Sequence, residues 1–285
     1  MPHARKNGKD IPMKVKIAAV QMPVVADKDE NLQTMRESVH RAAEEGASIV
    51  TLPEMFCCPY ANDSFVANKE PAGGKTWTAL SETAAREKIW LVGGSLPECT
   101  EAGNIYNTCF IFDRTGREIG RHRKVHLFDI DVKGGQRFKE SDVFTAGDDF
   151  TVVETDFGKI GVIICFDIRF PELSRILALQ GAQIIFVPGA FNMTTGPAHW
   201  DIHFRSRALD NQVFMVGCAP ARADSGYRSF GHSIAVDPWG RILKELEFEP
   251  GILVEEFELD DVPAVREQLP LLKARRTDRY ALEWK

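Results

Sequence analysis

Three residue types that could carry out acyl transfer stand near the ends of apolar segments in this sequence. Cys165 ends the apolar run 160–164, Glu54 follows a second apolar run, and Lys124 lies near the end of the segment 117–125. A cysteine thiol can attack an acyl carbon, and a carboxylate can take its proton. A lysine can stabilise the oxyanion that forms. Together the three would make a complete device for hydrolysis through a thioester.

The residues around the cysteine predict a turn between a strand and a helix. Pro171 and Glu172 follow Cys165, and proline with an acidic residue is typical of the first turn of a helix. The unpaired N–H groups at such a helix start favour a thiolate and can also bind an oxyanion. We therefore expect an activated thiol at this turn.

Each of these residues also has a purely structural interpretation. A glutamate or lysine at a strand end is often a solvated charge, and a buried cysteine often packs as a small hydrophobe. His122 and His126 flank Lys124, but this stretch resembles a strand end without a third ligand, so no metal site is predicted. No cofactor is expected. The remaining cysteines are expected to be inert; they are Cys57, Cys58, Cys99, Cys109 and Cys218.

The composition is that of a soluble globular protein. The chain has 285 residues, of which 44% are hydrophobic and 27% are charged. Its net charge of −6 gives no reason to expect a nucleic acid or an anionic membrane as a partner. No apolar run approaches the ~18 residues that would indicate a transmembrane helix.

The termini and the cysteine pattern suggest where the protein works. Residues 1–13 are polar and lack the apolar stretch of a signal peptide, so we expect a flexible extension. The six cysteines include no C-x-x-C pair, which argues against a disulfide framework and against structural zinc. A cytoplasmic protein with free thiols is predicted.

Hydrophobic periodicity and turn residues predict strands and helices in mixed order. The predicted strands are 14–22, 47–52, 89–95, 105–112, 117–125, 150–155, 159–165, 182–187, 212–218, 229–236, 241–246 and 252–257. The predicted helices are 29–45, 76–88, the segment from the cysteine turn to Gln180, 199–210 and 261–268. Residues 55–75 and 126–149 are predicted loops, and a loop as long as 126–149 is usually functional or disordered.

These elements predict one α/β domain over residues 14–268. No linker or shift in composition divides the chain. Two sheets packed together with helices on their outer faces would use this number of strands. The tail 269–285 mixes basic residues with leucine, tyrosine and tryptophan, so we expect it to pack at a subunit interface.

Three motifs in this order resemble the carbon–nitrogen hydrolase (nitrilase) superfamily. They are Pro53-Glu54, Arg123-Lys124-Val125-His126 and the segment 165–172, and the resemblance spans about residues 14–280. It implies an αββα sandwich that dimerises into an αββα–αββα assembly. It also implies that Glu54 is the base, that Lys124 stabilises the tetrahedral intermediate, and that Cys165 is the nucleophile.

The resemblance implies two further contributors to the reaction. The backbone N–H of Phe166 would be the second donor to the oxyanion. Glu140, in the segment 138–141, matches a second family glutamate that would orient Lys124 and help to position water.

The residues after the cysteine narrow the expected substrate. Nitrile-cleaving members usually continue with Trp-Glu, whereas this sequence has Phe166-Asp167, which favours amide hydrolysis. Segments 188–200, 205–212 and 231–233 resemble the omega-amidase branch, whose members release ammonia from the distal amide of 2-oxoglutaramate and 2-oxosuccinamate. N-carbamoyl amines or amino acids, deaminated glutathione and aliphatic amides remain alternative substrates. A non-catalytic dimeric scaffold of the same fold is a further alternative.

An omega-amide of this kind carries a carboxylate at its far end, and such a group needs an arginine fork or several donors in a dry pocket. Arg169, four residues after the cysteine, is the leading candidate; an ion pair with Glu172 or Asp167 is its structural alternative. His199 and Trp200, at a helix start, are expected to pack. The other predicted pocket residues are Phe191, Thr194, Thr195, Tyr60 and Phe56.

Overall fold

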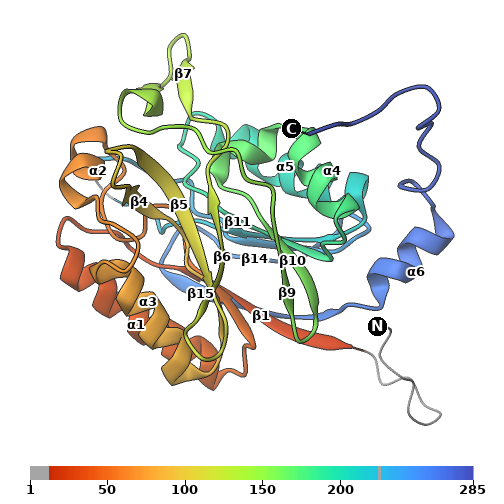
Figure 1. Cartoon of the computed structure of the whole chain (residues 1–285), viewed down its shortest axis with the longest axis horizontal. Helices are drawn as coiled ribbons and strands as arrows, with labels where there is room; N and C mark the ends of the chain where they lie inside the picture. The colour runs from red at the N-terminus through yellow and green to blue at the C-terminus, as the bar shows by residue number, and fades with distance from the viewer. Residues whose placement is uncertain (1–12, 224–225, 285) are drawn as a thin grey trace.

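Two β-sheets lie face to face with helices on their outer sides (Figure 1) in the computed structural model, which describes residues 13–223 and 226–284. The first sheet has the strand order β15-β1-β2-β3-β5-β4, with β6 paired to β5. The second has the order β14-β13-β12-β11-β10-β9. The predicted α/β sandwich is confirmed. The predicted extension 1–13 lies, apart from Met13, outside the described residues.

The strands are short and mixed in direction. Those of the first sheet are β1 (Lys14–Gln21), β2 (Ile49–Thr51), β3 (Trp90–Val92), β4 (Leu96–Cys99), β5 (Ile105–Phe112), β6 (Glu118–Arg123) and β15 (Gly251–Glu258). Those of the second are β9 (Thr151–Thr155), β10 (Gly158–Val162), β11 (Ile184–Pro188), β12 (Phe214–Cys218), β13 (Ile234–Val236) and β14 (Ile242–Glu245). The parallel pairs β1–β2, β2–β3, β10–β11 and β11–β12 form the centre of the two sheets.

The helices pack on both outer faces. They are α1 (Lys28–Glu44), α2 (Asn62–Asn68), α3 (Lys75–Glu87), α4 (Pro171–Leu179), α5 (Gly196–Asn211) and α6 (Asp261–Gln268). The alternation of side chains along β1 explains the layering, because Ile17 and Ala19 pack toward the second sheet, whereas Ala18 and Val20 pack with α1 and α3. Asp27 caps α1 by accepting from the N–H groups of Asp29 and Glu30.

Two segments that the sequence predicts as loops contain regular structure. Residues 55–75 include α2, whose only buried residue, Phe65, packs against Tyr60 with ring centroids 5.1 Å apart. Residues 126–149 contain the hairpin of β7 (Asp129–Asp131) and β8 (Arg137–Lys139), followed by the 3-10 helix η1 (Glu140–Asp142). Both elements are too short for periodicity to reveal, so tertiary contacts decide their structure.

Two predicted strands also differ from the structure. The predicted strand 89–95 ends at Val92, and β4 follows at the sheet edge, where its Pro97 is tolerated. The predicted strand 229–236 is regular only over β13, because residues 229–233 leave the sheet to bind other segments. Among them, Ser233 donates to Gln21 Oε1 over 2.9 Å through both its N–H and its hydroxyl.

The predicted order of strand, cysteine-bearing turn and helix is confirmed, although the turn itself is helical. Cys165–Arg169 form a separate 3-10 helix, η2, and α4 begins only at Pro171. The cysteine is therefore at the start of a short tight turn, six positions before the first residue of α4. Pro171 does occupy the first helical position, as its sequence context predicts.

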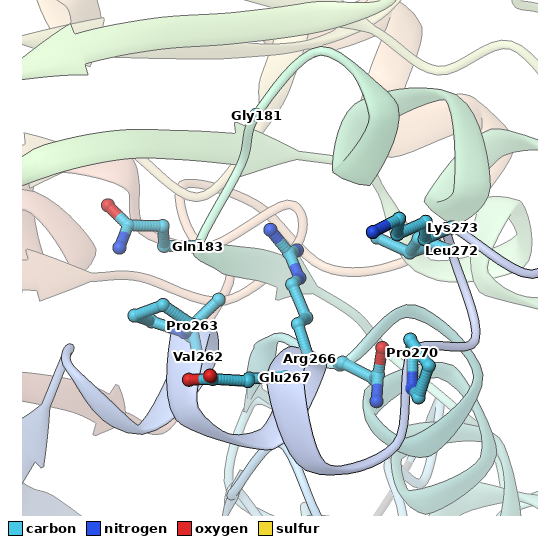
Figure 2. A pocket seen from close by; sticks show the side chains of 10 residues that line it. Gly181, Gln183, Val262, Pro263, Arg266, Glu267, Pro270, Leu272 and Lys273 are labelled. Carbon is cyan, nitrogen blue, oxygen red and sulfur yellow. The ribbon is translucent and has the colours of Figure 1, made fainter.

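The C-terminal residues run from α6 back toward α4. A pocket of about 510 Å³ lies between α6, the tail and the turn before β11, and Figure 2 shows Arg266 extending into it from α6, with Lys273 on the tail side. Farther on, Tyr280 and Arg275 line a second pocket with Arg175 of α4. In the described part of the chain, no helix is long and apolar enough to cross a membrane.

Candidate active site

Cys165 has an unusual backbone conformation for a residue with a side chain. Its φ is +47°, in the left-handed region, and the residue is only 4% exposed. A conformation of this kind costs about 1–3 kcal/mol and persists only where the surroundings hold it. Among the charged groups around it, Glu54 has the largest effect on the pKa of this thiol.

The carboxylate of Glu54 accepts hydrogen bonds from groups that belong to both sheets. Its Oε1 accepts from Asn107 Nδ2 and from Lys124 Nζ, each over 2.9 Å, and from the Tyr60 hydroxyl over 3.4 Å. Its Oε2 accepts from the backbone N–H of Ala190 over 2.9 Å. Asn107 belongs to the first sheet, and Ala190 follows β11 of the second, so this carboxylate is fixed between them.

Lys124 lies between two carboxylates with its side chain fully buried. Its Nζ is 2.9 Å from Glu54 Oε1 and 2.9 Å from Glu140 Oε2. Burial alone lowers the pKa of Lys124, but Glu140 and Glu54 outweigh burial and hold that pKa above its ordinary value. The lysine is therefore an ammonium ion beside the cysteine.

Glu140 holds Lys124 from the hairpin side. Its carboxylate accepts from the Tyr60 hydroxyl over 2.7 Å and from the backbone N–H of Phe128 over 2.6 Å. Burial raises the pKa of Glu140, and the charge of Glu54 adds to this, while Lys124 opposes it. The hairpin of β7 and β8 thus brings a second carboxylate to the lysine.

The thiol does not fit the expectation of a resting thiolate. Burial raises the pKa of Cys165 well above the ordinary value for a thiol, and the negative charge of Glu54 raises it further, more than Lys124 lowers it. The expected thiolate is wrong because α4 begins only at Pro171, and the charge of Glu54 acts on the thiol more strongly than that of Lys124. A neutral thiol needs a base if it is to attack an acyl carbon, and Glu54 is the charged group with the largest effect on the pKa of this thiol.

Asp167 joins the cysteine turn to the end of β6. Its carboxylate accepts from His122 Nε2 over 3.0 Å, from His126 Nδ1 over 2.9 Å and from His126 N–H over 2.8 Å. It also accepts from the Ile164 N–H over 3.0 Å, which closes η2. The two histidines that flank Lys124 therefore hold the turn. Within residues 13–223 and 226–284, no group of three or more His, Cys, Asp or Glu suited to a metal is found.

Arg169 does not pair with either of the acids considered as alternatives. Asp167 is bound to the histidines, and no ion pair of the described residues joins Arg169 to Glu172 or to Asp167. Its Nη1 instead donates to His199 Nδ1 over 2.9 Å and to His203 Nε2 over 3.3 Å. His199 was expected only to pack, so this contact corrects that expectation.

The remaining predicted pocket residues take different positions. Phe191 lies under the Arg169 guanidinium, 4.6 Å from its carbon to the ring centroid, and Phe166 stacks from another side at 5.5 Å. Thr195 is buried and Thr194 is exposed, and both backbone N–H groups donate to Asn192 Oδ1 over 2.9 Å.

A cavity of about 540 Å³ reaches Glu54 and Tyr60, and Cys58 and Tyr227 also line it. Phe56 is not one of its lining residues. Its ring is fully buried in the core cluster that includes α1 and α3, which places it as a core residue.

A model of the carbon–nitrogen hydrolase family matches residues 16–267. The chain belongs to the carbon–nitrogen hydrolase family. Omega-amidase NIT2 of Mus musculus is 44% identical over 271 residues, which cover 95% of this chain and 98% of that protein. The family membership makes this chain a C–N hydrolase, as the three motifs predict.

Solved structures of the superfamily share this fold. Nit3 of Saccharomyces cerevisiae, a member of branch 10 of the nitrilase superfamily, matches with a TM-score of 0.85 and 40% identity over 92% of this chain and 97% of that one. A mutant of the amidase from Nesterenkonia sp. AN1 matches with a TM-score of 0.77 and 27% identity over 93% of this chain and 95% of that one. That mutant shows covalent addition of the acetamide moiety of fluoroacetamide at its active-site cysteine.

Several site residues were not singled out from the sequence for a role here. Asn107 and Tyr227 carry no local signal, since only the folded chain brings them to Glu54 and to the cavity. His203 could have been found, because it follows His199 by four positions and therefore lies on the same face of a helix.

Proposed function

We propose that this hydrolase is an omega-amidase that releases ammonia from the distal amide of 2-oxoglutaramate or 2-oxosuccinamate. The observation that carries the substrate class is Arg169, whose guanidinium lies near the cysteine and is bound by neutral and aromatic groups rather than by a carboxylate. The similarity to omega-amidase NIT2 supports the same choice.

The first half of the proposed reaction forms a thioester. Glu54 takes the thiol proton while Sγ of Cys165 attacks the amide carbon, and the carbonyl electron pair moves onto oxygen. Lys124 and the Phe166 N–H hold that oxyanion. As the oxyanion collapses, the C–N bond breaks and Glu54 returns the proton to the departing ammonia.

The second half hydrolyses the thioester. Glu54 takes a proton from water, whose oxygen attacks the thioester carbon, and the same donors hold the second oxyanion. Collapse breaks the C–S bond, and the proton on Glu54 returns to sulfur. Glu140 keeps Lys124 in place through both halves and helps to position the water, because it is hydrogen-bonded to the lysine and to Tyr60.

Replacement of the nucleophile tests the chemistry. Cys165→Ala should lower ammonia release from 2-oxoglutaramate by about 10⁴-fold or more, since a catalytic unit without its nucleophile loses most of its acceleration. Ammonia release by this variant at a rate close to the wild type would contradict the thioester route. Cys99→Ala, at a half-buried cysteine, is the matched control and should keep full activity.

A substrate panel tests the specificity. We expect omega-amides with a distal carboxylate to exceed N-carbamoyl amino acids, deaminated glutathione, aliphatic amides and nitriles in kcat/KM. Arg169→Ala should lower kcat/KM for acidic amides far more than for neutral ones. Equal losses on both would reject Arg169 as the carboxylate-binding residue, and a panel led by another class would replace the substrate assignment.

We also propose that the enzyme is a cytoplasmic homodimer. In support, the six cysteines are free thiols, and large apolar side chains are exposed on α4, α5 and the tail; they are Leu179, Ile202, Leu209, Leu269, Tyr280 and Trp284. Light scattering should give about twice the chain mass of 31.9 kDa. Removal of residues 269–285 should shift the mass toward the monomer, and an unchanged dimer would exclude the tail from the interface.

A further inference from the structure

One face of α5 contacts the cysteine turn through three side chains that are spaced four residues apart. His199, His203 and Arg207 share this face because four positions are close to one helical turn. Arg207 holds the backbone of the turn: its Nε donates to Ile168 O over 2.9 Å and its Nη2 to Arg169 O over 3.2 Å. The two histidines hold the Arg169 side chain itself.

The hydrogen bonds from the Arg169 guanidinium determine the protonation states of the His199 and His203 imidazole rings. A guanidinium can only donate, so His199 Nδ1 and His203 Nε2 must each present a lone pair to Arg169 Nη1. His199 is therefore the Nε2–H tautomer, His203 is the Nδ1–H tautomer, and both are neutral. Burial, with Arg169 adding to it, lowers the pKa of both histidines, and that of His203 lies at about 4.

These contacts leave one edge of the guanidinium without a hydrogen-bond partner among the described residues. Nη1 is taken by the two imidazoles, and the rings of Phe191 and Phe166 restrict the plane of the group. Nε is buried and has no hydrogen-bond partner among the described residues. Nη2 has no partner among them either. The Nε–Nη2 edge is one that binds a carboxylate through two parallel hydrogen bonds.

We propose that His199 and His203 are positioning residues for substrate specificity, which hold Arg169 so that its Nε–Nη2 edge receives the distal carboxylate of the substrate. This inference rests on the proposed function, because it assumes an acidic amide as substrate. Nothing in it requires the histidines to touch substrate or to transfer a proton.

Paired substitutions separate the acceptor role from packing. His199→Leu and His203→Leu remove the acceptors, whereas His199→Asn and His203→Gln keep an acceptor close to the original nitrogen. Each leucine variant should raise KM for 2-oxoglutaramate by about 10-fold or more, because a hydrogen bond to a charged group is lost. The kcat should stay within about threefold, and the amide variants should recover most of the loss.

A neutral amide and a control on the same helix complete the test. Turnover of propionamide should be unchanged in every histidine variant, and Asp201→Asn, on an exposed part of α5, should leave both substrates unaffected. Leucine variants that keep the wild-type KM for the acidic amide would overturn the inference. So would equal losses on both amides, or a failure of the amide variants to recover.

A second readout distinguishes this inference from the proposed function. The rates at which iodoacetate and iodoacetamide alkylate Cys165 report the charge selectivity of the site without any turnover. The leucine variants should lower the iodoacetate-to-iodoacetamide ratio, and an unchanged ratio would reject the role of the histidines. A wild-type enzyme that hydrolyses no acidic amide would reject the proposed substrate, and the alkylation ratio would still decide the inference.

Discussion

Glu54 is hydrogen-bonded to Lys124, Asn107, Tyr60 and the Ala190 N–H. A carboxylate held by this many donors loses little freedom when it takes a proton from the thiol, since its position is already set. The ammonium of Lys124 is held 2.9 Å from this carboxylate. At the scale of residues, the site is preorganised in its resting state.

Tyr60 connects the two carboxylates, so its hydroxyl should matter for kcat. In Tyr60→Phe, Glu140 loses a 2.7 Å hydrogen bond and becomes a worse partner for Lys124. We expect kcat to fall by about 10-fold, as for loss of a hydrogen bond to a charged group, while KM changes little. Steady-state kinetics on 2-oxoglutaramate measure this. Tyr280→Phe, on the exposed tail, is the control, and an unchanged kcat in Tyr60→Phe would remove the hydroxyl from the reaction.

The sequence singles out Glu54, Lys124 and Cys165 because each lies near the end of a predicted strand within a recognisable motif. It does not identify Asn107 as a site residue, because its partner Glu54 is 53 positions away and only the pairing of β5 in the sheet brings them together. The charge state of the thiol was also mispredicted, since it depends on a carboxylate and on burial that local sequence does not reveal.

At the scale of elements, hydrogen bonds join the end of β6 to the cysteine turn. Lys124 faces Glu54, while its neighbours His122 and His126 both donate to Asp167 of η2. His126 also stacks on Phe170, with ring centroids 3.6 Å apart. Lys124 and Cys165 are therefore fixed relative to each other by His122, His126 and Asp167.

Asp167→Ala should break this connection. It leaves buried donors on His122, His126 and Ile164 without partners, so we expect a loss of about 2–5 kcal/mol in the free energy of unfolding, together with a lower kcat. Urea denaturation followed by circular dichroism measures the first effect. Asp142→Ala removes an exposed ion pair with Lys139 and should cost less than about 1 kcal/mol. Equal costs for the two variants would contradict the role of Asp167.

The longer helices and most strands follow from the sequence, because their apolar spacing persists over several turns or pairs. The small hairpin of β7 and β8 does not, although it delivers Glu140 to the site. Each strand has a single apolar residue, Ile130 or Phe138, which is too little for a periodic pattern, and contacts with other segments hold the hairpin, such as that between Phe138 and Tyr60. Elements of this size are predictable only from the tertiary structure.

At the scale of the whole molecule, the contact between α5 and the cysteine turn should make stability depend on pH. The pKa of His203 falls from 6.5 to about 4 on folding, chiefly through burial, with Arg169, Arg207 and His199 adding to it. The unfolded chain therefore binds more protons between these values, and stability falls as pH drops from about 6.5 to about 4. Above about 6.5 this histidine has no such effect.

His203→Gln removes this dependence because glutamine does not titrate. When the pH is lowered from 7 to 4.5, the urea midpoint of unfolding should therefore fall less in His203→Gln than in the wild type. His40→Gln is the control, since the pKa of His40 is shifted upward by Glu87 instead. An identical acid-induced loss in wild type and His203→Gln would show that this histidine is protonated in the folded state.

Because its resting thiol is neutral, Cys165 should react slowly with peroxide. Peroxide reacts with the thiolate of cysteine, so a thiol whose pKa burial and Glu54 keep high presents little of the reactive species. In the proposed mechanism the sulfur becomes strongly nucleophilic as Glu54 takes its proton. Cys165 should therefore be slow to form a sulfenic acid, and the enzyme should stay active at peroxide concentrations that inactivate enzymes with a permanent thiolate.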